Sequence, residues 1–244
     1  MNKGHIYEEK INSILRNHGV LKPGKASAGS SAVDPDSIFV HKGKEYNLEI
    51  KSDGADYCQQ VILWDKTNGW HWGEENIVTG LFDDLKVLGS INFEPNKYRF
   101  NNNQITEEMK KNDQKMIKNT NNEADNQILF EYYKSKGTYY IQIENFGFFY
   151  LSEDIANLGV DQFNGKLFWR TRGKTHNRNR YLVNNKKVTK TKYLKVDDNQ
   201  EKEKIETPWN YSFFCILKLH TKNDNYSNFN INIDEGCKFP PFEI

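Results

Sequence analysis

Residues 34–53 read DPDSIFVHKGKEYNLEIKSD, and this stretch decides how the chain is interpreted. It opens on Asp-Pro-Asp, closes on Glu-Ile-Lys before the final Ser-Asp, and holds two strand-like runs separated by a turn. With Gly43-Lys44 as the two-residue turn, Asp36 faces Lys51 across the two strands. Residues that face each other, and residues two apart along one strand, project to the same side of a sheet. The pattern therefore predicts that Asp36, Glu49 and Lys51 converge on one face at the open end of a β-hairpin.

The other face of this hairpin is predicted to be buried. Its residues are mostly apolar or aromatic, and they are Ser37, Phe39, His41, Tyr46, Leu48 and Ile50. On the polar face, two carboxylates held close together repel each other unless a cation lies between them. The hard oxygens of Asp36 and Glu49, with the carbonyl of Ile50 as a third ligand, suit Mg²⁺, for which Mn²⁺ can substitute.

Lys51 lies beside this predicted metal site. Its ammonium group could polarise a metal-bound water or stabilise charge that builds up on a phosphate. The alternative is a cross-strand salt bridge between Asp36 and Lys51, which contributes little to stability on a surface. That alternative gives no role to Pro35 or Glu49.

The spacing of these residues resembles the signature of the PD-(D/E)XK nuclease superfamily. Pro35-Asp36 is separated by twelve residues from Glu49-Ile50-Lys51, across two predicted strands and after an initial helix, as in that family. The length of the chain resembles type II restriction endonucleases. The resemblance implies a Mg²⁺-dependent, site-specific endonuclease of double-stranded DNA, with these three charged residues as catalytic groups. It also implies a catalytic role for Gln59, and a homodimer if both strands of a palindromic site are cut.

Residues 6–18 are predicted to form the initial helix, because apolar residues recur at helical spacing from Tyr7 to Leu15. At 100° per residue, Glu8 falls at the margin of this apolar stripe and Glu9 falls in solvent. Related nucleases often take an additional acidic residue from this helix, so the resemblance makes Glu8 a candidate catalytic residue. The alternative is a glutamate that the helix dipole favours in the first turn.

The formal net charge of +1 hides an uneven distribution. Residues 166–195 hold eleven Lys and Arg and no Asp or Glu, so the remainder of the chain carries about −10. Aromatic residues are interleaved with these cations, a pattern that favours contact with a polyanion over a solvated surface. The segment is predicted to contact DNA through Arg170, Arg172, Lys174, Arg178, Arg180, Lys186 and Lys187.

The rest of the chain predicts one α/β domain, residues 1–244, with a central mixed β-sheet flanked by helices in a restriction-endonuclease-like core. A helix is expected to end at Gly137, a hairpin to turn at residues 145–147, and further strands to include residues 166–172 and 210–220. Residues 55–65 fit a helix or a strand. The Asn-rich segment 94–126 has few large apolar residues and is predicted to be an exposed insertion with one helix.

Composition excludes several other classes of protein. Three widely spaced cysteines without a Cys-x-x-Cys pair argue against a cysteine zinc site and for a reducing, cytoplasmic location. No apolar run approaches the length of a membrane span, and the motifs of zinc proteases, serine hydrolases and P-loop enzymes are absent from the sequence. Two alternatives to a restriction enzyme stay open: a repair, recombination or junction-resolving nuclease, and a DNA-binding protein without catalysis.

Overall fold

The computed structural model describes residues 3–22, 35–91, 122–176, 180–188, 190–197, 199–205 and 210–219. Its first element is the helix α1 (Lys3–Asn17), which buries the predicted stripe from Tyr7 to Leu15. The chain leaves the helix through Gly19, whose φ of +71° lies in the left-handed region that glycine adopts without steric cost.

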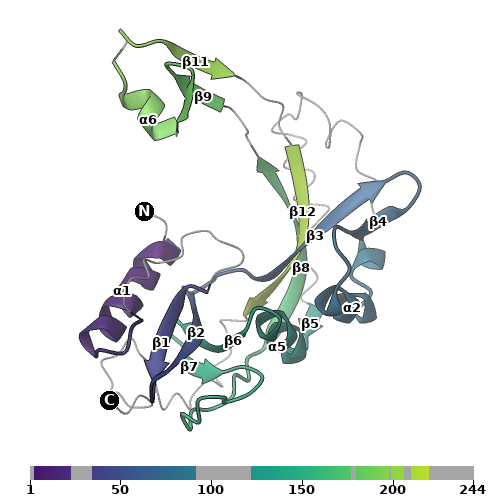
Figure 1. Ribbon diagram of the computed structural model, residues 1–244. Coiled ribbons are helices and arrows are strands. Elements are labelled where there is room, and N and C mark those ends of the chain that lie inside the picture. Colours follow the sequence, from purple (N-terminus) through teal and green to yellow (C-terminus); the bar gives the residue numbers. More distant parts are fainter. Residues whose placement is uncertain are drawn as a thin grey trace.

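A four-stranded mixed sheet follows α1. It contains β1 (Ser37–His41), β2 (Lys44–Lys51), β6 (Thr138–Ile143) and β7 (Gly147–Tyr150), in the order β1-β2-β6-β7. The strands β2 and β6 run parallel, and the other two pairs are antiparallel. Figure 1 shows α1 lying beside this sheet, and the two share a core that includes Ile11, Leu15, Phe39, Leu48, Tyr140 and Phe148.

The turn of the β1–β2 hairpin lies one residue earlier than predicted. Lys42 and Gly43 form it with φ values of 49° and 73°, and His41 pairs with Lys44. Two successive positive φ angles match the right-handed twist of the flanking strands, and glycine favours them. Moving the turn by one residue shifts each pairing by two positions. A shift of two leaves every side chain on its predicted face. The face predicted to be buried is buried except for Tyr46, which is half-buried, and Glu49 on the polar face is buried as well.

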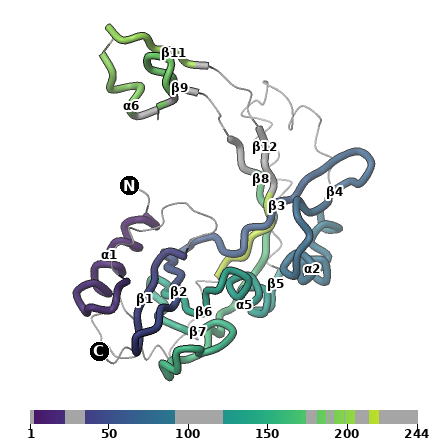
Figure 2. Tube along the Cα trace, viewed as in Figure 1, coloured from purple at the N-terminus to yellow at the C-terminus, as the bar shows by residue number. Residues whose placement is uncertain are grey.

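A second sheet is antiparallel and has five strands in the order β4-β3-β12-β8-β5. The strands are β3 (Tyr57–Asp65), β4 (Gly69–Trp72), β5 (Asn122–Ala124), β8 (Leu167–His176) and β12 (Asn210–Leu219). The helices α2 (Ile77–Asp84) and α5 (Asn126–Lys134) and the short η1 (Leu88–Ser90) pack against it, around a core that includes Phe82, Leu129 and Leu217. Figure 2 shows β3, β8 and β12 running alongside one another. Residues 57–65, which fitted either a helix or a strand, form a strand because β4 and β12 pair with both of its edges.

A third, three-stranded sheet has the order β10-β9-β11. It consists of β9 (Arg180–Val183), β10 (Lys186–Val188) and β11 (Lys202–Ile205), accompanied by α6 (Lys190–Lys195). Figure 1 shows this unit beyond the ends of β8 and β12, away from the other two sheets. The basic segment 166–195 is therefore divided between a strand of the main body and the separate small unit.

The predicted α/β class, with a mixed sheet flanked by helices, is confirmed. The expected helix ends before Gly137, and the expected hairpin joins β6 to β7 through Asn145, which has a φ of 67°. The boundary of the predicted insertion is corrected, because residues 122–124 pair with β8 and α5 begins at Asn126. Residues 94–121 of the predicted insertion, with its one helix, lie outside the described residues. No helix in the described ranges is long and apolar enough to span a membrane.

Candidate active site

The open end of the β1–β2 hairpin brings three charged side chains together. The Lys51 ammonium contacts Glu49 Oε1 and lies 3.8 Å from Asp36 Oδ2. The backbone N–H of Ile50 donates a hydrogen bond to Asp36 Oδ2 at 2.9 Å. The predicted convergence of Asp36, Glu49 and Lys51 is thus present in the structure, with one cation shared between two carboxylates.

A buried tyrosine holds one of these carboxylates. Tyr133, in the last turn of α5, donates its hydroxyl hydrogen to Glu49 Oε1 at 3.1 Å. Both residues are buried, and an unpaired carboxylate there would be costly. No sequence pattern indicated this role, because an aromatic residue on the apolar face of a helix is expected in the core.

The pKa of Asp36 is raised to about 7, mainly by burial and secondly by the nearby charge of Glu49. The ammonium of Lys51 and the hydrogen bond from Ile50 lower it, and the more distant Glu8 raises it. The carboxylate of Asp36 is therefore poorly compensated in the absence of a further cation. A divalent cation beside it would favour its ionised form.

Lys51 is held in its charged form. Burial by itself lowers the pKa of Lys51, but the carboxylates of Glu49 and Asp36 outweigh this effect, so the pKa is raised above the usual value for lysine. Glu8 acts in the same direction. In the arrangement seen here, Lys51 is thus an ammonium group at neutral pH and a donor of hydrogen bonds.

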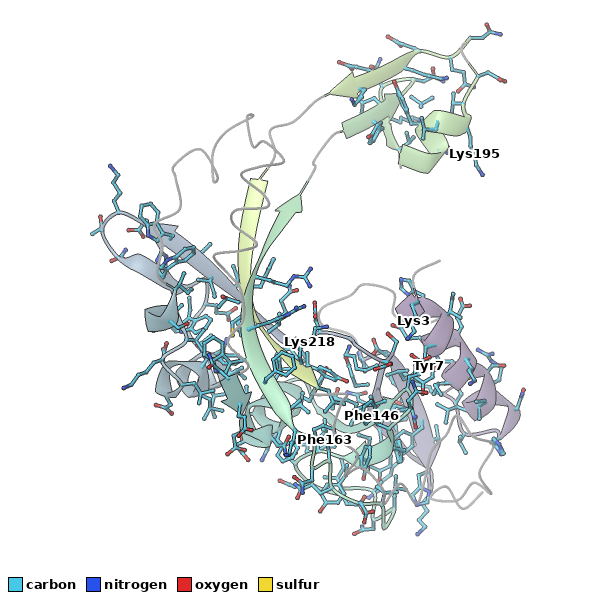
Figure 3. All side chains as sticks on the ribbon, turned by 180° about the vertical axis from the view of Figure 1, so that it is seen from behind. Lys3, Tyr7, Phe146, Phe163, Lys195 and Lys218 are labelled. Carbon is cyan, nitrogen blue, oxygen red and sulfur yellow. The ribbon has the colours of Figure 1, made fainter. Side chains whose placement is uncertain are left out.

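A cavity of about 480 Å³ opens beside these residues. Its walls come from α1, the end of β2, the loop that follows it, and the strands β8 and β12, and its charged lining residues are Lys3, Glu8, Lys51, Asp53, Asp56, Arg170, Arg172 and Lys218. Figure 3 labels Lys3 on α1 and Lys218 on β12, two of the elements that form the walls. A charged lining of this kind suits an ionic ligand better than an apolar one.

Glu8 lies at this cavity, as the helical angle predicted, while Glu9 is exposed. The side chain of Glu8 is 13% exposed and lies 3.4 Å from His5 Nδ1. Its charge is close enough to raise the pKa of both Asp36 and Lys51. The placement of Glu8 fits a role at the site, and the role itself stays a prediction.

The other predicted site residues lie in different places. Arg170 and Arg172 line the cavity, whereas Lys186 is exposed on the separate three-stranded unit. Gln59 is exposed on β3 and is not among the residues that line the cavity. Arg178 and the side chains of Lys174, Arg180 and Lys187 lie outside what the structure describes. Two cations at the cavity were missed: Lys3 on α1 and Lys218 on β12, both outside the basic segment.

The carboxylates of Asp36 and Glu49 can be compared with the ligands that a divalent metal ion requires. Among the described residues, no three His, Cys, Asp or Glu side chains are grouped closely enough to hold a metal ion. Mg²⁺ commonly takes only one or two protein carboxylates and completes its shell with waters and substrate phosphate oxygens. The pair formed by Asp36 and Glu49, already arranged around one ammonium, fits that chemistry.

Comparisons with known proteins find similarity to a solved structure but to no family model or curated protein. No protein-family model matches the chain, and no curated protein matches it. A solved structure, HhaI endonuclease in complex with DNA, is similar with a TM-score of 0.45 and 11% sequence identity over 93% of this chain and 94% of that chain. With a likeness at that level, the assignment of function below rests on the residues of the site.

Proposed function

We propose that this protein is a divalent-metal-dependent endonuclease that hydrolyses phosphodiester bonds in double-stranded DNA. The observation that carries the proposal is the shared position of two carboxylates and a lysine, Asp36, Glu49 and Lys51, at the edge of a cavity with further cations. Carboxylates hold the metal that such hydrolysis uses, and cations hold the phosphate backbone. Asp36 and Glu49 contact or approach Lys51, and Lys51 lines the cavity together with the further cations.

Asp36 and Glu49 would hold Mg²⁺ or Mn²⁺, and the carbonyl of Ile50 is the further protein ligand that the sequence suggests. When bound, the metal supplies positive charge at the phosphate and lowers the pKa of a bound water. Tyr133 fixes the orientation of Glu49 by its hydrogen bond, so that carboxylate is positioned before substrate arrives. The hydrogen bond from Ile50 does the same for Asp36.

Lys51 would act on the reacting phosphate. In hydrolysis, a water oxygen bonds to phosphorus, one bridging P–O bond breaks, and the leaving oxygen takes up a proton. Negative charge builds on the phosphoryl oxygens during this exchange, and a preorganised ammonium group stabilises it. Because the neighbouring carboxylates keep Lys51 protonated, charge stabilisation and orientation of the water are the roles that fit the structure best.

We extend the proposal to a site-specific type II restriction endonuclease of the PD-(D/E)XK superfamily that works as a homodimer. The support is the order of the elements, with a helix, then the hairpin that carries Asp36 and Glu49-Ile50-Lys51, then a mixed sheet. Two-fold symmetry would place one centre on each strand of a palindromic site. A repair or junction-resolving nuclease would use the same centre but would read the shape of DNA instead of its sequence.

One observation favours a second candidate, a DNA-binding protein without catalysis. The Lys51 ammonium already contacts Glu49 and approaches Asp36, which is also what a structural salt bridge looks like. In that case the cations would still bind DNA, but no metal would be needed. The two candidates differ in whether Mg²⁺ leads to cleavage.

The test is incubation of mixed-sequence DNA with the protein and Mg²⁺ or Mn²⁺, followed by sequencing of the product ends. Discrete ends at one sequence support a restriction enzyme, and scattered ends support a nuclease that reads shape. Asp36→Ala, Glu49→Ala and Lys51→Ala should each abolish cleavage while DNA binding persists. Glu153→Gln, an exposed change that removes the same kind of charge elsewhere, should cut at the wild-type rate. Binding without any metal-dependent cleavage by the wild type would leave the second candidate.

A further inference from the structure

Three cations from two neighbouring strands converge on one carboxylate in the cavity. Lys218 Nζ lies 2.6 Å from Asp56 Oδ1, Arg170 Nη2 lies 3.5 Å from the same oxygen, and Arg172 contacts Oδ2. The four side chains are partly buried and carry a formal charge of +2, from three cations and one carboxylate. We call Arg170, Arg172 and Lys218 the cationic triad.

Strand geometry fixes the direction of the triad. Arg170 and Arg172 are two apart on β8, and Lys218 on β12 pairs with Phe168, which is two residues before Arg170. All three therefore project from the same face of the sheet. The opposite face carries buried residues such as Trp169 and Leu217, which anchor the two strands in the core. The triad is presented by two paired strands and not by a loop.

A single carboxylate does not satisfy the triad. The buried Nε of Arg170 has no hydrogen-bond partner among the described residues. Lys218 reaches past Asp56 to donate to the carbonyl oxygen of Gly54 as well. A guanidinium fork is shaped for two oxygens of one anion, and phosphate oxygens match it as well as carboxylate oxygens do. The triad thus has both surplus charge and an unused donor.

The triad shares its cavity with Lys51 of the candidate active site. Successive phosphates of one strand advance by only about 3.4 Å along the helix axis of DNA. A strand whose scissile phosphate lies at Lys51 therefore brings further phosphates past the same walls. Phosphates are held by charged and polar groups, and the lining of the cavity is largely of that kind.

We propose that the cationic triad is a phosphate subsite, which holds a backbone phosphate beside the one that is hydrolysed, and that Asp56 fills this subsite in the free protein. This inference rests on the function proposed above. Asp56 lies at the end of the loop between β2 and β3, so it joins the active-site strand to the sheet that bears the triad. DNA must displace its carboxylate from the three cations, and Asp56 thereby weakens the binding of every anionic ligand.

The competing interpretation is structural, with Asp56 tying the β2–β3 loop to the sheet. The two interpretations predict opposite effects of Asp56→Asn on DNA. A competitor that loses its charge should tighten binding, by about threefold to tenfold for an ion pair that is partly exposed. A structural tie that is lost should weaken binding, because the loop and the neighbouring Lys51 would lose their position.

The experiment measures binding of a fluorescently labelled DNA duplex of mixed sequence by anisotropy, in EDTA, over a series of salt concentrations. Asp56→Asn should bind about threefold to tenfold more tightly than the wild type. Lys218→Gln should bind more weakly and reduce the slope of log affinity against log salt by about 0.9. The charge-matched controls are Glu153→Gln and Lys134→Gln, an exposed pair at 3.3 Å that is not part of the cavity.

The outcomes separate the subsite from the function on which it rests. Variants at Asp56 and Lys218 that only match their controls, or an Asp56→Asn protein that binds more weakly, would overturn the subsite even if the wild type cleaves DNA. Thermal melting of each variant in the same buffer identifies one that has failed to fold, and Arg172→Gln then replaces it with the same expectation as Lys218→Gln. A wild type that binds DNA with the expected variant effects but never cleaves it would support the subsite and refute the nuclease. A wild type that does not bind DNA would overturn both.

Discussion

Asp36→Asn should stabilise the metal-free protein at neutral and alkaline pH. The folded protein raises the pKa of Asp36 from 3.8 to about 7, mainly because the group is buried and secondly because Glu49 is close. Between these two pH values the folded state keeps a proton that the unfolded chain has lost. The free energy of unfolding therefore falls as pH rises through this window, and the loss is complete above it. At about 1.36 kcal/mol per pH unit, it reaches at most about 4 kcal/mol.

Asparagine would remove this loss because it does not ionise, while its side-chain oxygen can still accept the hydrogen bond that the N–H of Ile50 now gives to Asp36. Urea unfolding in EDTA, at about pH 5 and about pH 8, gives the free energy of unfolding from which the difference is taken. We expect the wild type to lose more stability than Asp36→Asn between the two pH values. Glu153→Gln, an exposed carboxylate change, should follow the wild-type profile.

The same two proteins, in buffer without EDTA, test the metal site. Mg²⁺ or Mn²⁺ at 100 times its dissociation constant should stabilise the wild type by about 2.7 kcal/mol, and Asp36→Asn should lose most of that gain. Parallel pH profiles of the two proteins would refute the claim that burial and Glu49 act against the charge of Asp36. A gain from metal that is equal in both proteins would remove Asp36 from the ligands.

Three other changes test separate parts of the structure. Glu8→Gln should slow cleavage more than about tenfold with little loss of stability. Glu9→Gln, on the exposed side of α1, should not change the rate, and small and equal effects of the two changes would remove Glu8 from the mechanism. Tyr133→Phe deletes a buried hydrogen bond to a carboxylate, so it should lower the free energy of unfolding by about 1.5–3 kcal/mol. It should also lower kcat more than it alters KM, and an unchanged kcat would contradict the positioning role of Tyr133. Gly165→Ala should destabilise the fold by about 1–3 kcal/mol, since a Cβ there would lie 2.3 Å from Phe163 Cζ, and a melting temperature equal to that of the wild type would mean that the ring moves aside freely.

The candidate catalytic group could be predicted from the sequence because its geometry is local. Alternation along two strands sets which side each residue takes, and it depends only on residues that are close in the chain. For this reason the prediction tolerated an error in the position of the turn, which moved from Gly43-Lys44 to Lys42-Gly43 and left Asp36 and Glu49 on the same face. The angle of Glu8 on α1 was predictable for the same reason, since helical periodicity is also a local property.

What surrounds that group was decided only by the tertiary structure. Tyr133 reaches Glu49 from 84 residues away in the chain, and Lys218 contacts the carbonyl of Gly54 across 164 residues. Such contacts form only when the whole chain closes its loops, and no pattern of neighbouring residues encodes them. The same holds for residues 57–65, which became a strand because β4 and β12 supply hydrogen-bonding partners on both edges. The sequence thus determined which face the charges occupy, and the packing of distant strands and helices determined what those charges meet.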